Sequence, residues 1–286
     1  MGSFSALLLG LDPLSAPSTP LDHCRVSLPF RPTGTQRMAR ALAGSLARIL
    51  PVPRRKEVLQ LARQVEPGLP EEFPRRLFQR AVEQSALLLA GGWENLDLGP
   101  LAELGDPWTK RDSPTLFLSM HHGNWEWLAG ILHVLRSDAI GVARAAHHPL
   151  GQNLLQFVRH FHRTPVLYDR EGFKAAIRTL DRGGLVAFLP DQRPPSQGEP
   201  GVWLGKPTQV TPLPRRWAES RSMDLWVGQL SPESSTAYAL ELFRYPPEAL
   251  EVWDQILDFH FIPWVRQSPD LHFGFFHKRL VPRETF

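Results

Sequence analysis

Short apolar runs alternate with amphipathic segments from residue 115 to residue 190. The runs TLFLSM, AIGVARA, TPVLYD and LVAFLPD are typical of buried strands, and the segments between them have the spacing of helices. Strands that alternate with helices form βαβ units and a parallel sheet. MDLWVGQLS and AYALELFRY add two strands as a hairpin-like pair. The pattern predicts an α/β fold with a mostly parallel central sheet flanked by helices.

The N-terminal part of the chain has a different composition and spacing of apolar residues. Residues 1–36 are rich in Pro, Ser and Thr without a clear period, and we expect an irregular lead-in there. Residues 36–98 have helical spacing, with arginines on one side and large apolar side chains on the other, namely Met38, Leu42, Leu46 and Ile49. Prolines separate the helices, and Gly91-Gly92 ends the last one. We expect residues 37–286 to form a single domain with a helical N-terminal portion.

Composition limits the classes of function. The basic charge is almost all arginine, which binds phosphate and carboxylate with two hydrogen bonds at once. This bias favours anionic partners, or it merely reflects a GC-rich genome. A single cysteine, Cys24, excludes an internal disulfide. Because no stretch approaches the roughly 20 apolar residues of a membrane-spanning helix, we expect a protein that is soluble or lies on a membrane surface.

The segment HHGNWE lies between an expected strand and an expected helix, where sites form in α/β sheets. Gly123 relaxes the backbone, Asn124 is a good N-cap, and Glu126 falls in the first helical turn. His121 and Glu126 can meet only if His121 precedes the helix. A histidine accepts protons near neutral pH, and a neighbouring carboxylate fixes its tautomer. The pair is a candidate general base and orienting acid.

A nucleophile is the missing component of such a pair. The chain has no GxSxG segment, and Cys24 lies in the expected lead-in. We therefore expect the substrate's own hydroxyl or amine to attack, which implies group transfer without a covalent enzyme intermediate.

HHGNWE resembles the H-x4-D/E box of the glycerolipid and lipid A acyltransferases, and most closely the HFGNWE form of the lauroyl/myristoyl acyltransferase family. Four further segments resemble that family in the same order: GVARAAHHPL, DRGGLVAFLPDQ, GVWLGKPTQVTP and SPDLHFGFFHKRL. The similarity extends over about residues 40 to 280. The chain is thus similar to the lipid A biosynthesis acyltransferases, within the lysophospholipid/glycerolipid acyltransferase superfamily.

This resemblance implies transfer of an acyl chain from an acyl carrier protein or coenzyme A thioester to a hydroxyl or amine of a lipid acceptor. His121 would be the base and Glu126 its orienting acid. Arg144 would bind an acceptor phosphate or the phosphopantetheine of the donor. Asp191 and Gln192 would shape the pocket, and Asn124 would donate to the oxyanion. No cofactor is implied beyond the donor substrate.

The resemblance also implies a location at the cytoplasmic face of the bacterial inner membrane. The family's usual N-terminal membrane helix is absent from the sequence, so we expect peripheral attachment to the membrane surface. A non-catalytic lipid-binding module and a thioesterase-like hydrolase are the alternatives. We expect no metal, because HExxH is absent, and no nucleic acid or nucleotide, because GVWLGKPT lacks the spacing of a phosphate loop.

Overall fold

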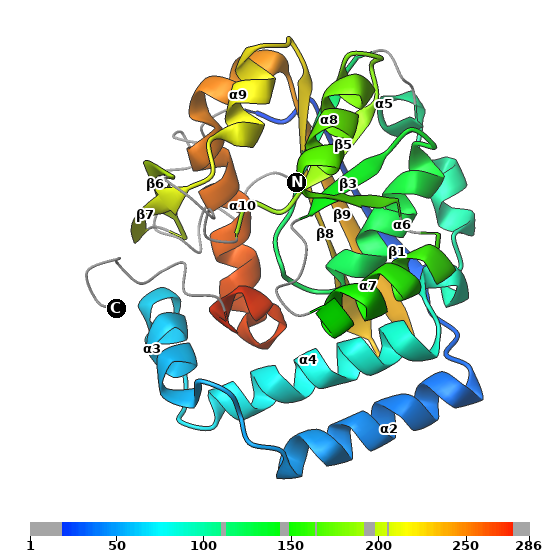
Figure 1. Cartoon of the computed structure of the whole chain (residues 1–286), viewed down its shortest axis with the longest axis vertical. Coiled ribbons are helices and arrows are strands. Elements are labelled where there is room, and N and C mark those ends of the chain that lie inside the picture. Colours follow the sequence, from blue (N-terminus) through cyan, green and yellow to red (C-terminus); the bar gives the residue numbers. More distant parts are fainter. Residues whose placement is uncertain are drawn as a thin grey trace.

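The computed structural model describes residues 19–109, 113–143, 149–163, 165–191, 198–204 and 206–276. Within these residues a central sheet carries helices on both faces, and the N-terminal helices lie across one end of it (Figure 1). The expected α/β class is confirmed.

The main sheet of the described chain has seven strands in the order β1-β9-β8-β2-β5-β3-β4. Strand β8 and the four strands beyond it in that order are parallel, whereas β9 is antiparallel to β8 and to β1. The prediction of a mostly parallel sheet is therefore confirmed. The strand bounds are β1 Asp22–Pro29, β2 Thr115–Leu118, β3 Ile140–Ala143, β4 Val166–Tyr168, β5 Leu185–Phe188, β8 Asp224–Ser234 and β9 Ala237–Tyr245.

Helices fill the connections as the spacing predicts, and the N-terminal portion is helical. The last N-terminal helix ends before Gly91, whose φ of 154° suits glycine. The α-helix bounds are α2 Gly34–Ile49, α3 Arg55–Val65, α4 Phe73–Ala90, α5 Asp106–Thr109, α6 Trp125–Leu135, α7 Pro149–Phe161, α8 Asp169–Leu180, α9 Leu213–Glu219 and α10 Trp253–Gln267. The short 3-10 helices are η2 Trp93–Asn95, η3 Gly99–Glu103, η4 Pro247–Val252, η5 Pro269–Leu271 and η6 Phe273–Phe276.

Strand β2 is buried on both faces, which explains its uninterrupted apolar sequence. Leu116 and Leu118 face an apolar cluster that includes side chains of α3, α8 and α10. Phe117 faces the opposite cluster, to which α6 contributes Trp127 and Ile131. Because helices cover both faces, the open edge at the carboxyl ends of the parallel strands is where a site can form.

One feature differs from the sequence-based expectation, and a second was not predicted. The irregular lead-in is wrong for Asp22–Pro29, which forms the edge strand β1 and alternates half-buried with exposed side chains. The segment around GVWLGKPT forms an antiparallel pair outside the main sheet, β6 Glu199–Trp203 and β7 Lys206–Val210. In the described part of the chain, no helix has the length and apolarity needed to cross a bilayer.

Candidate active site

His121 and Asp191 meet because two parallel strands end in register. Strands β2 and β5 are neighbours, and Leu118 pairs with Phe188. His121 and Asp191 each lie three residues beyond that pair. The carboxyl ends of parallel strands share one edge of the sheet, so the two side chains are brought together there.

The Asp191 carboxylate holds His121 by two contacts. Nδ1 of the imidazole lies 2.6 Å from Oδ1, and the backbone N–H of His121 donates to Oδ2 at 2.8 Å. The Asp191 side chain is fully buried, whereas 14% of the His121 side chain is exposed. The ring is therefore fixed in orientation and still reaches solvent.

Electrostatics keep Asp191 ionised. Burial of the carboxyl raises its pKa, but the charge of His121 and the hydrogen bonds from that residue, with a further contribution from His272, hold the pKa well below its usual range. A carboxylate at Nδ1 makes that nitrogen the donor, so the neutral ring carries its acceptor lone pair on Nε2. This is the arrangement of a general base with its orienting acid.

The loop that carries His121 is braced from two sides. Gly123 has a φ of 60°, and a Cβ there would lie 2.2 Å from the carbonyl oxygen of Leu230, so only glycine fits. The N–H of Gly123 donates to the Leu271 carbonyl, and the N–H of Phe273 donates to the His121 carbonyl. These two bonds tie the loop to the segment after α10, and the N–H of Asn124 ties it to β8 by donating to the Leu230 carbonyl.

Glu126 lies in the first turn of α6 as expected, but it does not orient His121. Its carboxylate accepts two hydrogen bonds from Arg159 of α7, at 2.9 and 2.5 Å, and Arg159 donates a third to the hydroxyl of Tyr168 at 2.6 Å. The predicted pairing of Glu126 with His121 is therefore wrong, because the strand register supplies Asp191 to Nδ1 and leaves Glu126 facing α7.

An apolar cavity of about 60 Å³ lies between α6, α7 and the carboxyl ends of β3 and β5. Glu126 and Arg159 line it, so their ion pair is the polar element of an otherwise largely apolar wall. Trp125 also lines it, and its ring lies 5.1 Å from the ring of His121, centre to centre. Trp125 therefore connects the cavity with the histidine.

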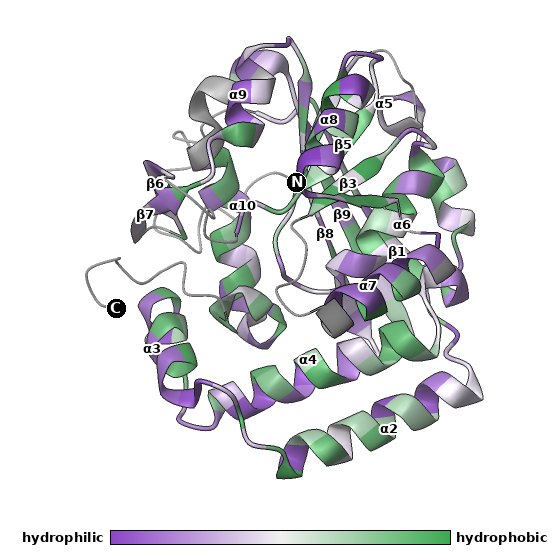
Figure 2. Ribbon diagram, viewed as in Figure 1, coloured by the Kyte–Doolittle hydropathy of each residue, from purple (hydrophilic) through white to green (hydrophobic). Residues whose placement is uncertain are grey.

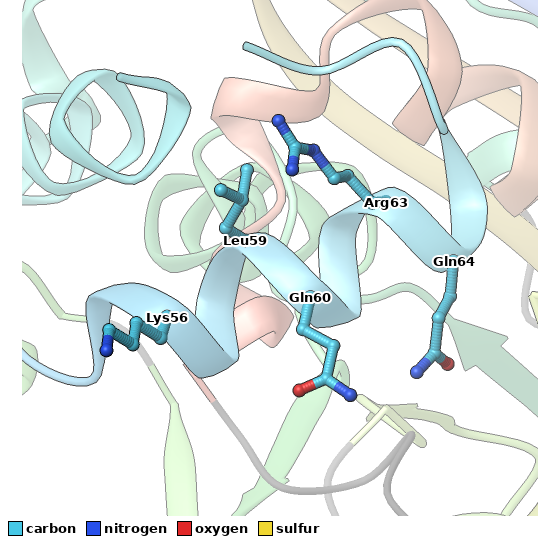
Figure 3. Close-up of a pocket in the computed structure, with 5 residues that line it drawn as sticks. All are labelled: Lys56, Leu59, Gln60, Arg63 and Gln64. Carbon is cyan, nitrogen blue, oxygen red and sulfur yellow. The ribbon is translucent and has the colours of Figure 1, made fainter. Parts of the chain in front are cut away.

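A second hollow lies on α3 and has a volume of about 410 Å³. One helix supplies its lining residues, which point to different sides of that helix (Figure 3): Lys56, Leu59, Gln60, Arg63 and Gln64. No histidine or carboxylate is among them, so this hollow does not combine a base with an orienting acid.

Residues 106–231 match the sequence model of the bacterial lipid A biosynthesis acyltransferases. The match confirms the family resemblance seen in the sequence, over a shorter range than the predicted 40 to 280 and less than half of the chain. His121, Glu126, Arg159 and Asp191 all lie within it. No curated protein matches the chain.

The match to the lipid A acyltransferases supports acyltransferase activity of that type. The geometry adds an imidazole that a buried carboxylate holds in one orientation. Cys24 lies on the edge strand β1, where burial raises the pKa of its thiol to about 11, so this thiol is not a ready nucleophile.

Three further residues named from the resemblance to the lipid A acyltransferases have different outcomes. Arg144 and Gln192 lie outside the described residues. Asn124 occupies the N-cap position of α6, but its side chain makes no capping bond, and its buried Nδ2 has no hydrogen-bond partner among the described residues. Its role as an oxyanion donor stays a prediction.

Two residues near the site escaped the sequence analysis. Arg159 sits in an ordinary amphipathic helix, where an inward-facing arginine has no motif to mark it. His272 is buried near Asp191, since a Cβ on Gly274 would lie 2.5 Å from its Nε2 and 3.2 Å from Oδ2 of Asp191. The described residues contain no group of three or more metal-binding side chains.

Proposed function

We propose that this protein transfers a fatty acyl chain from an acyl carrier protein or coenzyme A thioester to a hydroxyl, or an amine, of a lipid acceptor. A lipid A precursor or another glycolipid is the class of acceptor that we propose. The contact of His121 with the buried Asp191 carries the proposal, because it provides an oriented base at the edge of the sheet. The match to the lipid A acyltransferases supports the reaction class.

The proposed reaction begins with proton transfer from the acceptor hydroxyl to Nε2 of His121. The hydroxyl oxygen attacks the thioester carbonyl, and Asp191 stabilises the imidazolium that has formed. The C–S bond then breaks, the thiolate leaves, and it takes the proton from His121. The products are the acylated lipid and the free thiol of the donor, without a metal or further cofactor.

The apolar cavity beside Trp125 is the proposed location of the acyl chain. Its volume of about 60 Å³ has room for about four water molecules, so a long chain can enter only if the walls separate. Arg144, Gln192 and Asn124 remain proposed substrate contacts on the grounds of the family resemblance. We also propose that the enzyme works at the cytoplasmic face of the bacterial inner membrane as a peripheral protein.

Two alternatives use the same observations differently. A thioesterase-like hydrolase would use His121 to activate water in place of a lipid. A lipid-binding module would need the cavity but not a buried carboxylate held against a histidine. The cost of burying that charge favours a catalytic function.

The test is an assay with a labelled acyl donor, with and without a lipid acceptor. We expect the wild type to move label to the acceptor, and His121→Ala to lose about 10² to 10⁴ of the rate while remaining folded. His133→Ala is the matched control, because His133 lies on α6 and its Nδ1 lies 3.4 Å from the carbonyl oxygen of Ala139, away from His121 and Asp191. This control should transfer label at the wild-type rate.

Each alternative gives a different result in this assay. Release of free fatty acid at the same rate with and without acceptor indicates a hydrolase. Binding of acyl lipid without turnover indicates the lipid-binding module. Full transfer by His121→Ala contradicts the proposed mechanism.

A further inference from the structure

Helix α2 turns its large apolar side chains toward solvent. Met38, Leu42, Leu46 and Ile49 are 62%, 59%, 51% and 78% exposed. Their spacing places them on one face of the helix, and we refer to these four residues as the α2 stripe. Exposed contiguous apolar side chains of this size mark an interaction surface.

The opposite face of α2 explains why the stripe stays outside. Ala43, Gly44 and Ala47 are buried, and α2 packs on α4, beyond which it is the outermost layer (Figure 1). The helix therefore attaches to the protein through small residues and leaves its large ones without a partner in the described structure. Figure 2 shows apolar and polar residues alternating around the same helix.

The charged residues of helix α2 all have one sign. Helix α2 contains three arginines and no acidic residue. A cavity of about 580 Å³ at its N-terminal end is lined by Arg31, Arg37 and Arg40, which we call the arginine cleft, and no acidic side chain is among the described residues that line it. The guanidinium of Arg40 lies 3.8 Å from Glu83, while Arg31 and Arg37 are exposed.

The stripe and the candidate active site belong to the same end of the molecule. The loop of His121 is bonded to Leu271 and Phe273, next to η5. Asp270 of η5 forms an ion pair with Arg80 of α4 at 3.2 Å, and α4 carries α2. A binding partner that docks on α2 therefore lies toward the edge of the sheet that carries His121.

We propose that the α2 stripe and the arginine cleft dock the protein on an anionic phospholipid bilayer. The stripe enters the boundary of the acyl chains, and the arginines of the cleft bind lipid phosphates. This deepens the peripheral attachment of the proposed function by assigning its surface. A second copy fits less well, because a two-fold contact through the stripe would bring Arg37 and Arg48 of both copies together.

The test is flotation of the full-length protein with vesicles of phosphatidylcholine alone or mixed with phosphatidylglycerol, at low and high salt. The stripe variant is Leu42→Gln/Leu46→Gln, and the cleft variant is Arg31→Gln/Arg37→Gln. The control is Val134→Gln/Val202→Gln, two residues that are 47% and 41% exposed on other elements. All six positions are at the surface, so circular dichroism and thermal unfolding should stay unchanged.

We expect the wild type and the control to bind the mixed vesicles, and binding to weaken as salt rises. The stripe variant should lose about tenfold or more in affinity. The cleft variant should lose about fivefold per arginine and depend less on salt. Wild-type binding that is absent, or that both variants retain in full, overturns the proposal.

Analytical sedimentation measures whether the protein forms a dimer. A dimer that the wild type forms and the stripe variant does not form also overturns the proposal, since the stripe would then bind a second copy. Acyl transfer to an acceptor dispersed in detergent separates the two proposals. The stripe variant should retain that transfer. Its absence in the wild type would count against the acyltransferase and leave the docking surface intact.

Discussion

Asp191 reaches His121 from a different strand of the sheet, 70 residues further along the chain. A sequence motif links residues that are near in the chain, so HHGNWE directs attention to Glu126. The carboxylate on the ring comes instead from the register of β2 with β5, which no local pattern reveals. Asp191 was named only as a pocket residue, although its place just beyond a strand was the available signal.

Asp191→Asn tests the orienting role directly. The amide keeps the volume but loses the charge that stabilises the imidazolium, and it offers Nδ1 a weaker partner. We expect kcat to fall by about 10²-fold or more with little change in KM for the acyl donor. Steady-state kinetics with a labelled donor measure both constants. A variant with wild-type kcat would exclude Asp191 from the reaction.

Glu126→Gln and Arg159→Gln should affect activity as a coupled pair. The two side chains share two hydrogen bonds in the wall of the cavity, so removal of either partner frees the other. We expect the double variant to be no worse than the poorer single variant, measured as kcat/KM in a double-mutant cycle. Additive losses would show that Glu126 acts independently of Arg159, as a direct role at His121 requires.

At the scale of elements, the spacing of apolar residues and the glycine and proline stop signals were sufficient to predict most helices and the strands that are buried on both faces. The stop at Gly91-Gly92 and the hairpin-like pair that became β8 and β9 are examples. Strand β1 was missed because its alternation of Cys24, Val26 and Leu28 toward the core is surrounded by Pro, Ser and Thr. Strand order and the packing of α6 against α7 depend on contacts between distant segments, which spacing does not encode.

Under the proposed function, the packing of α6 over the sheet sets the length of the acyl chain that the cavity accepts. Ala129 lines the cavity, so Ala129→Phe should fill part of it and shift the preference toward shorter acyl donors. Val134→Phe on the exposed side of the same helix is the control. Rates with a series of donor lengths measure the preference. An unchanged preference in Ala129→Phe would place the acyl chain elsewhere.

At the scale of the whole molecule, two buried histidines couple stability to pH. Burial lowers the pKa of His122 to about 4 and that of His260 to about 3. The unfolded chain protonates each ring below pH about 6.5, whereas the folded rings stay neutral to much lower pH. The unfolded state thus binds more protons in this window, and the free energy of unfolding decreases as pH falls.

The measurable consequence is acid lability between pH 6.5 and 4. At pH 5 each buried ring should cost about 2 kcal/mol of stability relative to pH 7.5. His260→Gln removes one titration while retaining an acceptor for the hydroxyl of Tyr245. Chemical denaturation at both pH values should show a smaller loss in the variant than in the wild type. An equal loss in the two proteins would contradict the assignment.

The bonds from Leu271 and Phe273 to the loop of His121 also have a temporal consequence. A ribosome makes the histidine about 150 residues before it makes the segment that braces it, an interval of roughly 10 to 30 s at ordinary rates of synthesis. The nascent polypeptide therefore holds an unsupported base during that time. The loop of His121 is therefore braced only after the segment that contains Leu271 and Phe273 has been synthesised.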